Sequence, residues 1–223
     1  MGTIAAQTLI NRAAHLLEDT GNTTWTRSEL LGWLNEAQGQ VVTFAPSANP
    51  VRQNLSLVAG TYQALPARTS ILMDIPRNVN GPAVRMVSRE LLDNGPFDWH
   101  TAKPSATVRN YVYDSREPEA FYVYPPNTGA GQVVVLTAAI PLVITSETAS
   151  IEVHDNYEAA LLNYMMFRAY SKDTDYVASD TTKAAAYYTA FKDALSGDKV
   201  AGPEASASSA MSPANPSSEG TLR

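Results

Sequence analysis

Apolar residues at helical spacing predict a pair of helices at each end of the chain. They recur every three or four positions, so each helix carries one apolar stripe. The expected helices run between Thr3 and Gly21, between Thr26 and Pro46, between Asp155 and Ser171, and from Ala184 to Ser196. Because no helix can bury its stripe alone, the simplest arrangement packs the two hairpins together as a four-helix bundle.

Two boundaries of these helices have clear signals. Thr26 and Glu29 have the spacing of a capping box, in which each side chain accepts a hydrogen bond from the other residue's N–H group. Trp25 and Leu30 stand at the positions of a hydrophobic staple. Gly197 follows the last apolar residue of the fourth helix, and glycine is common just past a helix end. We therefore expect the last helix to end at Ser196.

Between the helical pairs the apolar period changes to two, which predicts strands. Residues 51–65 are expected to form a β-hairpin that turns at Ala59-Gly60-Thr61. Further strands are expected at 71–75, 84–87, 108–113, 121–124, 132–138 and 151–153. Strands inserted between helices indicate an α+β fold with a mostly antiparallel β-domain.

The predicted organisation has four parts. Residues 1–50 and 154–196 are the two helical hairpins, residues 51–153 are the inserted β-domain, and residues 197–223 are an extended tail. Ser, Ala, Pro and Gly fill 17 of the 27 tail positions. The tail therefore has too few large apolar groups to offset the entropy of ordering. The tail is therefore a flexible linker or a segment held by a partner. In the second case Val200, Met211 and Leu222 are its expected contacts.

Composition and charge narrow the function. The chain has no cysteine, so it has neither disulfides nor thiolate metal ligands, which fits a reducing cytoplasm. We find no apolar run that could cross a bilayer and no secretory signal, and expect no membrane partner. The net charge of −6 is spread evenly, without the clustered Lys and Arg that grip a phosphate backbone. Such a surface suits a wall past which DNA slides without sequence-specific binding.

Catalytic chemistry is sparse in the sequence. His15, His100 and His154 are far apart, and none has metal-ligand spacing with another ligand residue. His154 beside Asp155 could be an acid/base pair, but the position before a helix favours capping. Gly129-Ala130-Gly131 lacks the rest of a nucleotide-binding loop. We expect no enzyme activity, no metal and no cofactor.

Four tyrosines are the strongest candidates for a binding surface. Alternation places Tyr111 with Tyr113 and Tyr122 with Tyr124, and pairing of the two strands would make an aromatic ladder. Such a ladder could stack sugars or bases. Cross-strand packing or a subunit contact is the simpler interpretation and is weighted about four to one, because nucleic-acid sites usually carry clustered positive charge. Tyr122 and Tyr124 are the predicted partner-binding residues of this region.

The chain resembles bacteriophage head-to-tail adaptor proteins, the connector subunits related to the tail tubular protein A of short-tailed phages. The resemblance rests on patterns of packing residues. These are Leu16-Leu17-Glu18-Asp19, Glu29 to Ala37, Val58 to Pro66, Pro118 to Pro126, Ala159 to Met165, Arg168 to Asp173, and Ala185 to Tyr188 with Phe191. The Ser/Pro/Ala tail departs from the short C-termini of the family.

The resemblance implies a structural virion protein of the neck, assembled in the host cytoplasm. Family members form a ring, usually dodecameric, that binds the portal on one side and the tail nozzle or other tail proteins on the other. DNA passes through the channel that such a ring lines, and tail fibres are a further possible partner.

Two other functions compete with this one. The tyrosine strands could make a carbohydrate-binding or fibre-docking β module of a phage tail. A hydrolase with a dispersed site would need a buried carboxylate pair of raised pKa in a deep pocket, which the sequence does not indicate.

Overall fold

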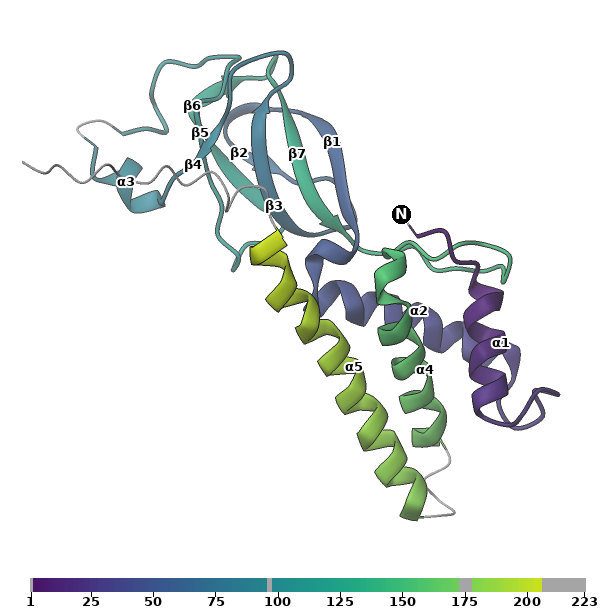
Figure 1. Ribbon diagram of the computed structural model, residues 1–223. Coiled ribbons are helices and arrows are strands. Elements are labelled where there is room, and N and C mark those ends of the chain that lie inside the picture. Colours follow the sequence, from purple (N-terminus) through teal and green to yellow (C-terminus); the bar gives the residue numbers. More distant parts are fainter. Residues whose placement is uncertain (1, 96–97, 173–177, 206–223) are drawn as a thin grey trace, which may run out of the picture.

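The computed structural model describes residues 2–95, 98–172 and 178–205 (Figure 1). Within them, five α-helices and seven strands are joined by loops and two short 3-10 turns, η1 (Pro46–Ala48) and η2 (Asp155–Tyr157). The helices are α1 (Ala6–Leu16), α2 (Arg27–Phe44), α3 (Arg89–Asp93), α4 (Glu158–Lys172) and α5 (Ala178–Ala205). The strands are β1 (Pro50–Ser56), β2 (Ala59–Ala64), β3 (Thr69–Asn78), β4 (Arg85–Met86), β5 (Asn110–Val112), β6 (Ala120–Thr128) and β7 (Gln132–Ala139).

The strands form two sheets, so the protein is α+β with a large β portion. One sheet has the order β1-β7-β3 and the other the order β2-β6-β5-β4. Every ladder between these strands is antiparallel except the β4–β5 ladder, which is parallel. Both sheets contribute to one apolar cluster, which includes Ile75, Phe121 and Val135 at 0% exposure. Figure 1 shows the strands gathered at one end of the molecule, away from α1 and the far ends of α4 and α5.

The predicted hairpin over residues 51–65 is wrong, because its two strands belong to different sheets. β1 pairs with β7, whereas β2 pairs with β6. Between the two strands, Leu57 packs in the β cluster. The backbone groups of Val58 bond to the buried side chain of Gln63 instead of to a neighbouring strand. Its amide oxygen accepts from the Val58 N–H at 2.8 Å, and its amide nitrogen donates to the Val58 carbonyl at 2.9 Å.

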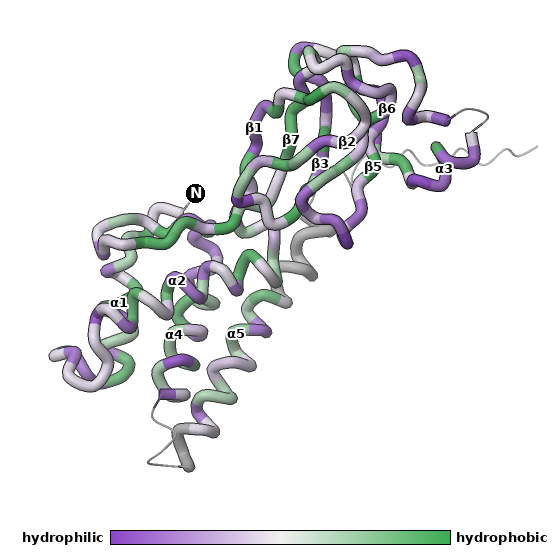
Figure 2. Tube along the Cα trace, turned by 180° about the vertical axis from the view of Figure 1, so that it is seen from behind, coloured by the Kyte–Doolittle hydropathy of each residue, from purple (hydrophilic) through white to green (hydrophobic). Residues whose placement is uncertain are grey.

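The predicted four-helix bundle of two terminal hairpins is also wrong. α2 runs across α4, and α1 and α5 lie on opposite sides of α4 (Figures 1 and 2). α4 packs against α5, α2 and α1, whereas α5 approaches α2 through the edge-to-face pair of Phe191 and Phe44, with centroids 6.1 Å apart. Three helices, α1, α2 and α5, therefore pack around α4 instead of sharing a common axis with it.

The connecting segment, residues 140–154, explains why α2 is not a bundle helix. It covers part of the α2 surface that a fourth helix would occupy. The Asn35 amide accepts from the Ile144 N–H at 2.7 Å and donates to the Ile144 carbonyl at 3.0 Å. The Gln38 side-chain oxygen accepts from the Glu152 N–H at 2.7 Å. Because these bonds come from an irregular segment, periodicity in α2 alone could not reveal what covers it.

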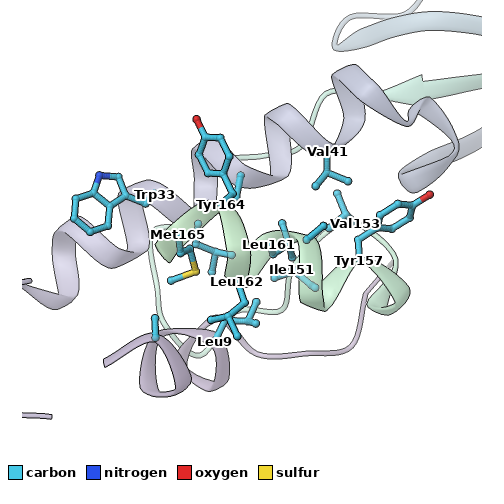
Figure 3. Packing of buried hydrophobic residues seen from close by; sticks show 14 of the residues in the cluster. Leu9, Trp33, Val41, Ile151, Val153, Tyr157, Leu161, Leu162, Tyr164 and Met165 are labelled. Carbon is cyan, nitrogen blue, oxygen red and sulfur yellow. The ribbon is translucent and has the colours of Figure 1, made fainter. Parts of the chain in front are cut away.

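The helical core is centred on α4. Its residues Leu161, Met165, Met166 and Ala169 are 0% exposed. Side chains of α1, α2 and the end of the connecting segment converge on them, including Leu9, Val41 and Val153 (Figure 3). None of the described helices is both long enough and apolar enough to cross a membrane.

The capping box at the start of α2 is confirmed. The Thr26 hydroxyl accepts from the Glu29 N–H at 3.3 Å, and the Glu29 carboxylate accepts from the Thr26 N–H at 3.0 Å. The same carboxylate accepts from Lys172 Nζ at 2.6 Å, which joins the end of α4 to the start of α2. The hydrogen bonds from Lys172 and Thr26 lower the pKa of Glu29.

The loop between α1 and α2 is organised around the Asp19 carboxylate. It accepts from the N–H groups of Thr23, Thr24 and Trp25 at 2.9, 2.8 and 2.9 Å, and from the Thr23 hydroxyl. These bonds, first of all the one from Trp25, lower the pKa of Asp19 to about 2. The Trp25 indole in turn donates to the Ala169 carbonyl at 3.1 Å, so this loop is fastened to α4.

The last helix continues past its predicted end. α5 runs to Ala205, so Gly197 lies inside it, and the predicted extended tail begins within a helix. This last part of α5 contains Gly197 and Gly202, and each glycine costs about 1 kcal/mol relative to alanine in a helix interior. The predicted tail residues 206–223 lie outside the described part of the chain.

Replacing Leu161 by Ala should destabilise the protein by about 2–5 kcal/mol, because it leaves a cavity where four elements meet. The measurement is urea unfolding followed by circular dichroism. Leu16, which is 49% exposed on α1, is the matched control, and its substitution by Ala should change stability by less than about 0.5 kcal/mol. Equal losses in the two variants would contradict this description of the core.

Replacing Asp19 by Asn should lower the unfolding temperature at neutral pH, since an amide cannot accept all the hydrogen bonds that the carboxylate accepts. The pKa of Asp19 falls from 3.8 to about 2 on folding, so its contribution is present above pH 3.8 and is lost as pH falls toward 2. Thermal unfolding of both proteins as a function of pH should therefore show their difference shrinking across this window. Parallel curves down to pH 2 would contradict the assigned role.

Candidate interaction surfaces

The predicted aromatic ladder does not form, because the two tyrosine pairs face opposite sides of the sheet. The register places Tyr122 opposite Val112 and Tyr111 opposite Val123. Tyr111, which is 3% exposed, therefore lies on the side of Val123 in the β cluster. Its hydroxyl donates to Asp74 at 3.1 Å, and burial followed by that carboxylate raises the pKa of Tyr111 to about 12. Strand alternation was predicted correctly, but the register that decides which faces meet was not available from it.

Tyr122 is instead the centre of an aromatic cluster that includes Tyr62 of β2. The two residues are paired in register, with ring centroids 5.5 Å apart and edge to face. Trp99 and His100 each place a ring 6.1 Å from Tyr122. The Arg89 guanidinium lies 5.9 Å from the Tyr122 ring centre.

The loop that carries Trp99 and His100 is held in place by specific contacts. The Trp99 indole donates to Asp93 of α3 at 2.7 Å, and its ring stacks on His100 at 3.7 Å. His100 Nδ1 and the Thr61 hydroxyl are 2.8 Å apart. No role for these residues was predicted from the sequence, although a lone tryptophan in a polar loop indicates that the loop packs against another part of the protein. The surroundings of Tyr122 are those of cross-strand packing and do not favour a sugar-stacking platform.

The predicted partner-binding residues do not gather at one site. Tyr122 and Tyr124 are half-buried on the outer face of β6, and Tyr124 lines a pocket of about 470 Å³ with Trp99 and Leu92. Val200 falls within α5, but its side chain is outside the described part of the structure, as are Met211 and Leu222 altogether. Binding roles for these five residues stay predictions.

The histidines serve local structure where their contacts are visible. His154 Nδ1 accepts from the Asn156 N–H at 3.3 Å, which makes His154 the N-cap of η2 and confirms the capping interpretation. Asp155 accepts from the Thr3 hydroxyl and from the N–H groups of Thr3 and Ile4, and these bonds lower the pKa of Asp155. Among the described residues, no three His, Cys, Asp or Glu side chains are placed so that they could share a metal ion.

A cavity of about 800 Å³ at the edge of the second sheet is lined by three cations, Arg85, Lys103 and Arg109. We call it the basic cleft. Its remaining walls are prolines, hydroxyl side chains, the Asn110 amide and apolar groups, and no carboxylate is among its lining residues within the described part of the chain. This surface was not predicted from the sequence, because Arg85 is distant in the chain from Lys103 and Arg109 and meets them only through the parallel β4–β5 ladder and the preceding loop.

An exposed apolar run lies on the connecting segment. Ile140, Leu142 and Val143 are 48%, 54% and 72% exposed. Figure 2 shows this run in green where the chain leaves β7. Because large contiguous apolar patches mark interaction sites, this run is a candidate contact surface. The described residues thus offer several surfaces for contacts with other proteins.

The family model described as SU10 adaptor protein matches residues 4–217, nearly the whole chain. No curated protein sequence matches the chain. The family match confirms the resemblance in its broader form, a structural adaptor of a phage virion, while the relation to tail tubular protein A stays a prediction. The chain belongs to the SU10 adaptor protein family.

Proposed function

We propose that this protein is the head-to-tail adaptor subunit of a phage neck. Copies form a ring, a dodecamer in the related connectors, between the portal and the tail nozzle or other tail proteins. The ring lines the channel through which the genome leaves during ejection, and its subunits are assembled in the host cytoplasm. The observation that carries the proposal is the adaptor family match over residues 4–217.

Surface features support a ring subunit. A ring closes through heterologous contacts, in which one face of a subunit meets a different face of the next. The exposed run at Ile140, Leu142 and Val143 supplies an apolar face on the helical side, at the opposite end of the connecting segment from η2. The β sheets at the other end of the molecule offer a separate surface (Figure 1). Two distinct faces are what head-to-tail closure requires.

The orientation of the subunit in the neck is a further part of the proposal. We propose that the helical side faces the portal, that residues 206–223 extend along the portal, and that the β sheets face the tail and any fibres. Many copies of a weakly binding tail add avidity, because each further contact is made at high effective concentration.

The charge of the protein fits a conduit for DNA. A net charge of −6 disfavours tight contact with phosphates, since non-specific DNA binding depends on clustered cations. DNA would pass such a wall without sequence-specific contacts.

Electron microscopy of the full chain mixed with the portal protein of the same phage should show a closed annulus attached to one end of the portal ring. The physical reason is that heterologous contacts close only at a fixed rotation per subunit. Portal alone is the control. Portal particles that carry single unconnected subunits, or none, would contradict the proposed function.

Truncation after Ala205 should weaken portal capture by about tenfold or more, equivalent to about 1.4 kcal/mol per site. This cut keeps α5 whole, so the buried Phe191 and Leu195 stay in place. A pull-down titration with the portal measures the loss, and an unchanged circular dichroism spectrum shows that the fold is intact. Undiminished capture would remove residues 206–223 from the portal contact.

A further inference from the structure

The basic cleft lacks the counter-charges that protein cations usually have. Arg85, Lys103 and Arg109 are exposed, and within the described part of the chain none of their side chains makes a hydrogen bond or an ion pair. By contrast, Arg12, Arg27, Arg68, Arg89, Arg116, Arg168 and Lys172 each lie in an ion pair. The protein has a net charge of −6, so a cavity with three unpaired cations and no lining carboxylate differs from the rest of its surface. An anionic group bound there would neutralise these cations.

The chemistry of the walls suits carboxylates. Two guanidinium groups can each hold a carboxylate with two parallel hydrogen bonds. Ser105, Thr107 and Asn110 add hydroxyl and amide groups beside them, and Pro82, Pro104 and Pro125 form rigid walls. A volume of about 800 Å³ admits a short loop of polypeptide and exceeds what a single small anion fills.

An exposed acidic loop, residues 114–119, lies at the other end of the same sheet. Asp114 is paired with Arg116 at 2.6 Å, so Glu117 and Glu119 carry the excess negative charge. Both glutamates are exposed. The loop leads directly into Ala120, the first residue of β6.

The sheet itself sets the separation between these two surfaces. Ser105 of the basic cleft donates its N–H to the carbonyl of Pro126, close to the far end of β6. The strand between Ala120 and Pro126 spans about 20 Å at about 3.3 Å per residue. β4 and β5 run parallel, so both begin at the basic cleft, and β5 ends at the acidic loop. The sheet therefore has a positive end and a negative end.

We propose that in the assembled ring the acidic loop of one copy enters the basic cleft of the next copy. This inference rests on the ring assembly proposed above and names a contact that holds it together. The two surfaces differ and lie at opposite ends of one rigid sheet, so a copy cannot satisfy its own cleft. Contacts of this kind are heterologous and propagate from subunit to subunit until the ring closes.

A DNA duplex fits the cleft less well than a second copy does. Neutralising three phosphates gives a salt dependence of only about −2.7 in log K against log[salt], which is weak for a DNA-binding protein. Duplex binding also needs an extended basic surface, whereas these cations line one concave cavity in an otherwise acidic protein.

Charge reversal provides the test. One full-length variant carries R85E and R109E in the cleft, and the other carries E117K and E119K in the loop. Each variant alone should lose at least about tenfold in self-association, because each then presents two ends of like charge. An equimolar mixture should recover assembly, since every junction again joins opposite charges. The readout is sedimentation velocity, together with electron microscopy in the presence of the portal.

Engineered cysteines give an independent readout, because the chain has none of its own. A variant with both Thr107→Cys in the cleft and Ser115→Cys in the loop should form a ladder of disulfide-linked oligomers under mild oxidation. A mixture of the two single variants should stop at dimers, which is the matched control. The ladder should weaken as ionic strength rises, since salt screens the pairing.

Several outcomes would overturn this inference. Rings that form equally well from either charge variant alone would overturn the contact while leaving the proposed function standing. Loss of assembly by both variants without recovery on mixing, or no ladder at any protein concentration, would exclude a second copy as the partner. Tight binding of a DNA duplex by the unaltered protein, lost in R85E/R109E, would reassign the cleft to DNA. Absence of rings for every protein, including the unaltered one, would refute the proposed function itself.

Discussion

Burial of α4 on several sides at once is the constraint on which the helical part depends. Leu161, Met165 and Met166 are fully buried, and no one neighbouring helix covers them. α5 packs along one side, α2 crosses another, and α1 closes a third. A helix with an apolar surface this wide needs neighbours in several directions, and here α2 provides one of them by crossing α4.

Polar side chains decide how the helices meet the sheets. The connecting segment is irregular, so its backbone groups need partners outside regular structure. Asn35 and Gln38 of α2 supply them for Ile144 and Glu152, while Arg68, from the loop before β3, donates to the Ile140 carbonyl at 2.6 Å. These bonds fix the segment that leaves Ile140, Leu142 and Val143 exposed. The face proposed for ring contacts is thus a consequence of how the two halves are joined.

The two ends of the second sheet have opposite charge, and the proposed contact between copies depends on this difference. Short parallel pairing of β4 with β5 brings Arg85 beside Asn110, and the preceding loop adds Lys103. The aromatic cluster around Tyr122 holds α3 and the loop of Trp99 against the other face of this sheet. That packing makes the sheet a rigid spacer between the two surfaces of the proposed contact.

Local signals in the sequence determined most element types, the Thr26–Glu29 capping box, the capping role of His154 and the adaptor family. These depend on residues close together in the chain or on patterns that a family repeats. The strand predicted at 151–153 is wrong, because these residues belong to the irregular connecting segment. Tertiary structure alone decided the crossing of α2, the separation of β1 from β2, the opposite faces of Tyr111 and Tyr122, and the continuation of α5 past Gly197. It also gathered Arg85, Lys103 and Arg109 into one cleft. Periodicity shows which face of an element is apolar, but long-range register and packing decide what that face meets.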